Sequence, residues 1–240
     1  MIILDMPQGS IDWIIARLWR LTASKLDPVI TSTGKLSNSI AATKAIDKLI
    51  AGLEAANVFQ ANPGIADNMN DRELQLFLAN YTGEKFSGNA HTERGHDCEP
   101  DAIAALSQIL GTQIESVGMC VIGDDMSGVV SCSPDGLIYD GGKIIAGAEI
   151  KSPALCNFYR HAIDSNLPED YTLQVHGSMA ICEVDTWHFG SYFKGKPLVH
   201  VEVKRSKLTD ALRESFEEFR ERYQERYLQV IESTERKEPA

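Results

Sequence analysis

The sequence lacks the features that mark membrane proteins, secreted proteins and nucleotide-driven motors. No run of about 18 apolar residues occurs, and the first residues show no cationic region followed by an apolar stretch. The phosphate-binding patterns G-x-x-x-x-G-K-[ST] and G-x-G-x-x-G are also missing, which disfavours ATP-driven translocation. We therefore expect a cytoplasmic protein with no membrane partner.

Cysteine is scarce and irregularly spaced. The sequence has five cysteines and no C-x-x-C pair: Cys98, Cys120, Cys132, Cys156 and Cys182. An odd number of scattered cysteines indicates neither a disulfide framework nor a zinc knuckle. We expect these thiols to be buried and reduced.

Positive charge is sparse, above all in the middle of the chain. The net charge is −11, and residues 61–135 carry 3 basic residues against 12 acidic ones. Binding to nucleic acid normally uses Lys and Arg to displace counterions from phosphates, so this charge argues against a nucleic-acid partner. A locally basic groove outside the middle third is compatible with the same numbers.

The sequence does have the composition of an ordinary folded protein. Hydrophobic residues make up 43% of 240 residues and charged residues 24%, which fits one domain over residues 1–240. Apolar spacing predicts helices within 11–26, 41–56, 71–81, 99–110, 171–181 and 208–231, with loops at 57–70 and 83–91. Strands are predicted within 114–122, 129–139, 143–151, 187–192 and 198–203, the first three as a meander. We expect an α/β fold with a central mixed sheet flanked by helices, and added N- and C-terminal helices.

Two of the predicted strands meet at the turn signal Asp140-Gly141-Gly142. A turn centred on either glycine pairs antiparallel residues whose numbers sum to about 283 or 284. In the second register Asp135 is the cross-strand neighbour of Glu149, with Cβ atoms about 5 Å apart. Because side chains alternate along a strand, Lys151 shares a face with Glu149. The hairpin thus predicts three charged side chains on one side of a sheet rich in Val, Ile and Leu.

This trio has the chemistry of a metal-dependent phosphodiesterase. Two adjacent buried carboxylates need a cation or a proton to compensate them. Oxygen ligands suit Mg²⁺ or Mn²⁺, whereas zinc favours His and Cys. Lys151 offers a positive charge that can activate a water or stabilise a pentacovalent phosphate.

Each piece of the pattern also has a purely structural interpretation. Pro134-Asp135-Gly136 is common turn chemistry, and Glu149 with Lys151 is typical of a solvated strand pair. Taken alone, each piece favours that interpretation. Their combination, PD-x(13)-E-x-K across one hairpin, favours the catalytic hypothesis.

The combined pattern resembles that of the PD-(D/E)xK nuclease superfamily, and its surroundings resemble the lambda exonuclease or YqaJ-type viral recombinase family. The matching segments are 133–137 and 149–153 in the hairpin, 95–99 before it, 171–179 after it, and Arg17 with 22–24 near the start. The resemblance covers about residues 11–205. One departure is Ser152, where the family commonly has Cys.

The resemblance implies a restriction-endonuclease-like core. It divides the chain into a helical DNA-end-binding segment over 1–60, a catalytic core over 95–205 and a C-terminal helix over 208–232.

It also implies a set of site residues. Two Mg²⁺ ions, for which Mn²⁺ substitutes, would be held by Asp135, Glu149 and the carbonyl of Ile150, with Glu99 as a third acidic group near them. Lys151 would orient or deprotonate the attacking water.

Further residues are implied to contact DNA. Gln174 and Tyr171 would flank the scissile phosphate, and Arg17 and Ser24 would contact the DNA end with its 5′-phosphate. The residues alone leave other interpretations open: a solvated cation for Arg17, a helix cap for Ser24 and a core residue for Tyr171.

The activity that the resemblance implies is processive 5′→3′ digestion of one strand of linear duplex DNA, leaving a 3′ single-stranded tail for a phage-type annealing protein. It implies a homotrimeric ring and a phage or prophage gene in a bacterial host. Two alternatives stay open: an endonuclease of the same superfamily, and a catalytically degenerate DNA-binding module. A nuclease with an iron–sulfur cluster is disfavoured, because four grouped cysteines are missing.

Overall fold

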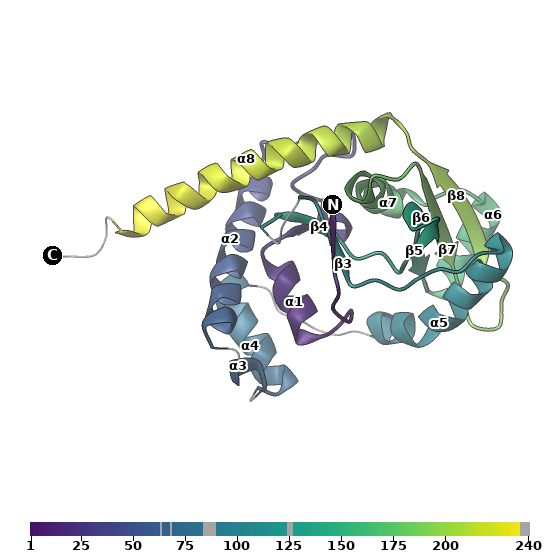
Figure 1. Cartoon of the computed structure of the whole chain (residues 1–240), viewed down its shortest axis with the longest axis horizontal. Coiled ribbons are helices and arrows are strands. Elements are labelled where there is room, and N and C mark those ends of the chain that lie inside the picture. Colours follow the sequence, from purple (N-terminus) through teal and green to yellow (C-terminus); the bar gives the residue numbers. More distant parts are fainter. Residues whose placement is uncertain (63, 68, 84–89, 124–126, 236–240) are drawn as a thin grey trace.

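This computed structural model describes residues 1–62, 64–67, 69–83, 90–123 and 127–235, whose strands form two four-stranded sheets (Figure 1). One sheet has the order β5 (Gly136–Asp140), β6 (Lys143–Lys151), β7 (Thr186–Ser191) and β8 (Val199–Lys204). In it β6 and β7 are parallel and the other neighbours antiparallel. The other sheet has the order β1 (Ile2–Leu4), β3 (Met119–Val121), β4 (Val130–Cys132) and β2 (Leu21–Thr22). The predicted mixed α/β fold is confirmed, with its strands divided between two sheets.

The chain passes from one sheet to the other between β4 and β5. The sequence predicted one continuous strand over 129–139, and that prediction is wrong: Ser133, Pro134 and Asp135 lie outside both strands. The proline has no N–H to give to a ladder, so the strand pattern breaks there. The predicted three-stranded meander is also wrong, because β3 belongs to the other sheet. The hairpin of β5 and β6 remains.

The helices surround these sheets. They are α1 (Ile11–Leu18), α2 (Ile40–Ala61), α3 (Gly64–Asp67), α4 (Asp71–Thr82), α5 (Ala90–Leu110), α6 (Leu155–Asp164), α7 (Glu169–Cys182) and α8 (Lys207–Glu235). A 3₁₀ turn, η1 (Ala23–Lys25), follows β2. None of the helices described is both long and apolar enough to cross a membrane.

Several helix boundaries differ from the sequence-based expectation. The predicted helix over 11–26 ends at Leu18, because the chain then enters β2 and η1. Helix α5 begins at Ala90, before the predicted start, so Gly95 lies inside a helix. Both α3 and α6 were missed, and the predicted loop at 83–91 falls largely outside the described residues.

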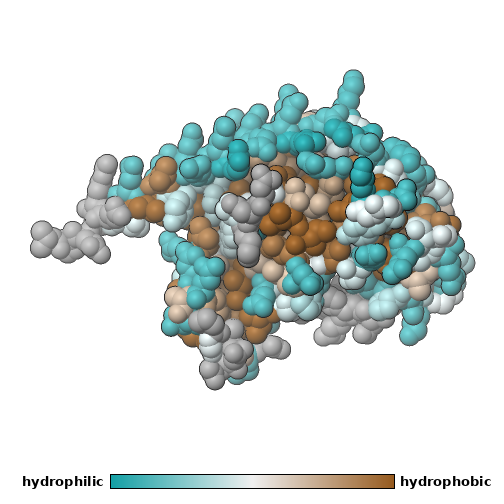
Figure 2. Space-filling model, viewed as in Figure 1, coloured by the Kyte–Doolittle hydropathy of each residue, from teal (hydrophilic) through white to brown (hydrophobic). Residues whose placement is uncertain are grey.

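The main core lies between the sheets, α7 and α8. Helix α8 runs along one side of the molecule, past α7 and α2 (Figure 1). Its apolar stripe is buried as core packing, with Leu212, Phe216 and Phe219 enclosed. Arg226 pairs with both carboxylate oxygens of Asp47 on α2, at 2.6 and 3.0 Å. The outward side of α8 is hydrophilic (Figure 2), so only the inner side of this helix contributes to the core.

The N-terminal helix α1 is held against α2 at a glycine. A Cβ on Gly52 would lie 2.2 Å from the carbonyl oxygen of Leu18, the last residue of α1. No side chain fits in that space. Gly52 thus sets how closely α2 approaches the helix that carries Arg17.

We expect Gly52→Ala to lower the free energy of unfolding by about 1–3 kcal/mol, because the added methyl group forces the two helices apart. The measurement is urea-induced unfolding of the full chain. Gly64→Ala is the control: nothing lies within 4 Å of its Cβ position, and its stability should match wild type. Equal stability of both variants would contradict the role of Gly52.

Candidate active site

The hairpin places Asp135 opposite Glu149. Gly136 pairs with Ala148, and the amide of Asp135 donates to the Ala148 carbonyl at 3.1 Å. The paired residues from Gly136 to Ile138 have numbers that sum to 284 with their partners. Asp135 lies just before β5, and it bonds to Ala148 through its amide and to the amide of Ile150 through its carboxylate, which places it opposite Glu149. A bulge nearer the turn shifts the remaining pairs by one residue. Both registers that the sequence left open therefore occur: the two pairs next to the turn sum to 283, and the pairs nearer to Asp135 sum to 284.

Glu149 is the most enclosed member of the site, with an exposed fraction of 3%. It lies on β6, an inner strand paired on both sides. Its Oε1 atom accepts hydrogen bonds from Nζ of Lys151 and Nε2 of Gln174, both at 2.6 Å. Gln174 reaches it from α7, whose following residues from Val175 onward are buried. These two bonds fix the orientation of the carboxylate.

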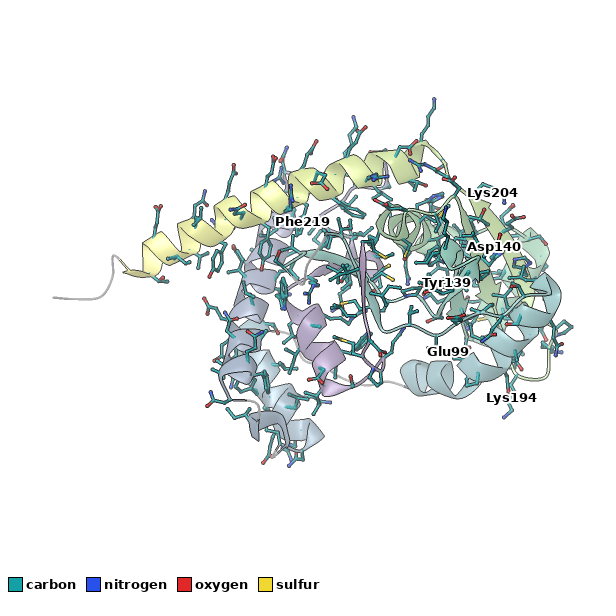
Figure 3. The ribbon with its side chains drawn as sticks, viewed as in Figure 1. Glu99, Tyr139, Asp140, Lys194, Lys204 and Phe219 are labelled. Carbon is teal, nitrogen blue, oxygen red and sulfur yellow. The ribbon has the colours of Figure 1, made fainter. Side chains whose placement is uncertain are left out.

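Asp135 is half-buried beside other acidic groups. Burial raises the pKa of its carboxyl group well above the ordinary value, and the charges of Glu149 and Glu99 raise it further. Lys151 and the amide of Ile150, which donates to Oδ2 at 2.5 Å, oppose that shift. Glu99 comes from α5 and lies on the side of that helix nearer to β5 and β6 (Figure 3). Asp135 and Glu149 of the hairpin and Glu99 of α5 are therefore close enough for their negative charges to repel one another.

Lys151 is held in its charged form. Burial by itself would lower the pKa of its ammonium group, but Glu149 and Asp135 more than offset this, and the pKa lies above its ordinary value. Its Nζ atom is 5.3 Å from the ring centre of Tyr171, and that ring stacks on Phe189 at 5.3 Å between centres. Tyr171 is thus half-buried packing and also a wall of the site.

Arg17 and Ser24 lie next to Ser133, in the segment that precedes β5 of the same hairpin. The guanidinium of Arg17 donates to Oγ of Ser133 at 3.0 Å and to Oγ of Ser24 at 3.1 Å. The indole N–H of Trp13 also donates to Ser133, at 3.1 Å. Burial lowers the pKa of Arg17, which Glu149 and Cys132 partly oppose. The structure brings the N-terminal element to within two residues of Asp135.

Trp13 was missed by the sequence-based reasoning. Its ring lies 4.3 Å from the guanidinium carbon of Arg17 and fixes that side chain from the preceding helical turn. The i, i+4 spacing of Trp13 and Arg17 on one predicted helix was the available signal.

A cleft of about 910 Å³ lies beside Arg17. It is bounded by α1, η1, α2 and α4, and hydrophobic residues gather where α1, α2 and α4 meet (Figure 2). Its lining carries one acidic residue, Asp27, and several basic ones: Arg17, Arg20, Lys25, Lys44 and Lys48. A basic group of residues is thus present despite the acidic net charge, and it includes Arg17, which bonds to Ser133 two residues before Asp135.

The carboxylates suit a hard cation in their chemistry. Asp135 and Glu149 offer oxygen ligands in a desolvated place, where the raised pKa of Asp135 shows that uncompensated negative charge is unfavourable. Their oxygens and those of Glu99 do not all lie within 4.8 Å of one another, and among the described residues only a group of three cysteines does. In this structure the carboxylate of Glu149 is hydrogen-bonded to Lys151 and Gln174.

The fold is that of an alkaline exonuclease. The structure is similar to the crystal structure of an alkaline exonuclease, LHK-Exo, from Laribacter hongkongensis, with a TM-score of 0.66, 22% identity, and 95% of this chain and 97% of that chain covered. It is also similar to LHK-Exo in complex with dAMP, with a TM-score of 0.68, 19% identity, and 95% and 99% covered. The model of the YqaJ-like viral recombinase domain matches residues 12–185, and the chain belongs to that family. Comparison with curated proteins found no significant match.

We expect Asp135→Asn to raise the thermal unfolding midpoint of the metal-free protein. A carboxyl group with a raised pKa destabilises the folded state when ionised, and asparagine keeps an acceptor for the Ile150 amide without the charge. A gain of about 1 kcal/mol would correspond to roughly 2–4 °C.

The measurement is a melting curve in EDTA at neutral pH, with the exposed Asp140→Asn as the matched control. Added Mg²⁺ should then raise the midpoint of wild type by mass action, and leave that of Asp135→Asn unchanged. A lower midpoint for Asp135→Asn in EDTA would contradict this account of the site.

Proposed function

We propose that this protein is a metal-dependent exonuclease that processively degrades one strand of linear duplex DNA in the 5′→3′ direction. The product would be a 3′ single-stranded tail, used in phage-type recombination by strand annealing. The observation that carries the proposal is the hairpin register that joins Asp135 and Glu149 beside Lys151 and Gln174. Membership of the YqaJ-like viral recombinase family and the fold shared with an alkaline exonuclease support it.

The acidic residues are proposed to hold Mg²⁺, with Mn²⁺ as a substitute. The ligands would be Asp135, Glu149 and the Ile150 carbonyl, with Glu99 as the further acidic group. When bound, two such ions supply Lewis-acid stabilisation of the attacking and leaving oxygens. Ionised Asp135 then has its compensating charge, which the metal-free site lacks.

Lys151 is proposed to orient or deprotonate the attacking water. Its ammonium is now paired with Oε1 of Glu149, and that pairing keeps its pKa high. If Glu149 binds a cation, its carboxylate attracts the ammonium of Lys151 less strongly, and burial then lowers the pKa of Lys151. The same side chain could then take a proton from water. Gln174 needs no charge change to keep Glu149 oriented.

Arg17 and Ser24 are proposed to bind the 5′-phosphate of the DNA end, with Tyr171 flanking the scissile phosphate. A half-buried guanidinium with two hydroxyl partners is preorganised for a phosphate. The basic cleft beside Arg17 offers a path for the DNA backbone. Residues 1–60 would thus bind the DNA end, and residues 95–205 would cut it.

The proposed assembly is a homotrimeric ring of single-domain chains, with the helix over 208–232 at the C-terminal end. A closed ring around DNA would keep the enzyme engaged without ATP, for which the sequence has no binding motif. The proposed partners are linear duplex DNA and a single-strand annealing protein, in the cytoplasm of a bacterial host.

Replacing Lys151 by alanine should lower the rate of nucleotide release by roughly 10² to 10⁴, the range for a positioned proton-transfer group. The assay is release from linear duplex DNA in Mg²⁺ under single-turnover conditions. Lys194→Ala, which removes an exposed lysine after β7, is the matched control and should leave the rate unchanged. A wild-type rate for Lys151→Ala would remove this residue from the mechanism.

DNA ends separate the proposal from its alternatives. We expect linear duplex with 5′-phosphates to be degraded in Mg²⁺ and spared in EDTA, and closed circular duplex to survive both. Arg17→Ala should remove the preference for 5′-phosphorylated over 5′-hydroxyl ends, because it deletes the group proposed to bind that phosphate.

Two results would redirect the assignment. Cutting of closed circles would favour the endonuclease, and binding of DNA without any Mg²⁺-dependent release would favour a degenerate binding module.

A further inference from the structure

Three buried thiols lie together beside the strand that leads into the active site. They come from separate elements: Cys120 on β3, Cys132 on β4 and Cys182 at the end of α7. Their exposed fractions are 0%, 2% and 4%. The expectation of buried thiols is confirmed for these three, whereas Cys98 is only half-buried and Cys156 is exposed. The sequence spacing gave no sign that the three would meet.

The three sulfur atoms are close enough to share one ion. All lie within 4.8 Å of one another, and those of Cys132 and Cys182 are 3.6 Å apart. Cys120 and Cys132 are direct cross-strand partners, so the backbone itself holds two of the three together. Around an ion with metal–sulfur bonds of about 2.3 Å, three sulfurs lie roughly 3.8–4.0 Å apart. The cluster needs only small side-chain shifts to reach that geometry.

We propose that Cys120, Cys132 and Cys182 form a binding site for Cu(I), a soft metal ion of low coordination number. Thiolate ligands select Cu(I), zinc and iron–sulfur clusters over hard cations. Structural zinc almost always takes four ligands. No His, Asp or Glu of the described residues joins the three sulfurs, so the group offers three ligands where structural zinc takes four.

The protonation of the cluster agrees with this assignment. Hydrogen bonds from the thiols of Cys132 and Cys182 lower the pKa of Cys120, whereas burial raises that of Cys132. The neighbouring thiols thus favour the thiolate form of Cys120. A cation would take over that role, and the remaining thiol protons would pass to solvent as it binds.

The site would be separate from the proposed Mg²⁺ site in both position and chemistry. Cys132 is the last residue of β4, before the segment that contains Asp135, and Cys182 ends the helix that carries Gln174. An ion shared by these thiols would tie β4 to α7. It would stabilise the folded state by mass action, whether or not the chain cuts DNA.

The test titrates the full-length, reduced protein with Cu(I) without oxygen, in the presence of a coloured Cu(I) chelator of known affinity. Metal content is then measured after desalting. We expect one copper per chain to be retained and the thermal unfolding midpoint to rise. Cys132→Ser and Cys182→Ser should each lose the retained copper. The double variant Cys98→Ser/Cys156→Ser is the matched control and should keep it.

A second measurement needs no variant. X-ray absorption at the copper edge of the loaded wild-type protein should show three sulfur neighbours and no nitrogen or oxygen shell. Loss of all copper from wild type on desalting would overturn the proposal, as would a nitrogen or oxygen shell. Retention of zinc at the same stoichiometry and with higher affinity than Cu(I) would overturn the assignment to an ion of low coordination number.

Discussion

The pairing of Asp135 with Glu149 across one hairpin is the constraint on which the rest of the site depends. Two carboxylates that neighbour each other in a desolvated place raise the free energy of the folded chain unless positive charge meets them. Lys151 and Gln174 compensate part of this negative charge through hydrogen bonds to Glu149, and the amide of Ile150 does so through a bond to Asp135. The pKa of Asp135 is still raised, so its negative charge is only partly compensated. The fold thus maintains an unmet preference for cations at the point where the N-terminal helix, the hairpin and α7 converge.

The sequence predicted this arrangement because its determinants are local. A turn signal and strand alternation put Glu149 and Lys151 on one face and limit the partner of Asp135 to two registers, since hairpin pairing follows from counting residues. The bulge that selects between these registers was not predicted. Gln174 and Arg17 contact residues far away in the sequence, which periodicity does not predict. The family resemblance implied roles at the DNA for these two residues, and the structure adds their contacts with Glu149 and Ser133. The change of sheet at Pro134 was missed, because a β-rich run looks the same whether its two halves pair with one sheet or with two. The meeting of the three thiols was missed for a related reason, as it depends on how β3, β4 and α7 pack.

The net charge of the chain does not describe the charge at the cleft, because acidic and basic residues are distributed unevenly. The acidic total of −11 describes the whole chain, yet the charged residues that line the cleft beside Arg17 are mainly basic. Fields near a surface depend on the nearest groups within a Debye length of about 10 Å, and distant acidic residues are screened. Acidic residues elsewhere repel phosphates away from the cleft. A polyanion would therefore meet an attractive surface in one place and repulsion over much of the rest.

The bulge in the β5–β6 hairpin has a consequence for how such sites diverge. It absorbs one residue between the turn and the acidic pair, so the pairing that unites Asp135 with Glu149 is insulated from the exact length of the loop. A relative could lose that residue, or gain one by widening the turn, and still present the same two carboxylates. The interval between them is thus a property of the connection and carries no chemical meaning. Searches that hold the interval fixed would overlook proteins whose reacting groups superimpose on these.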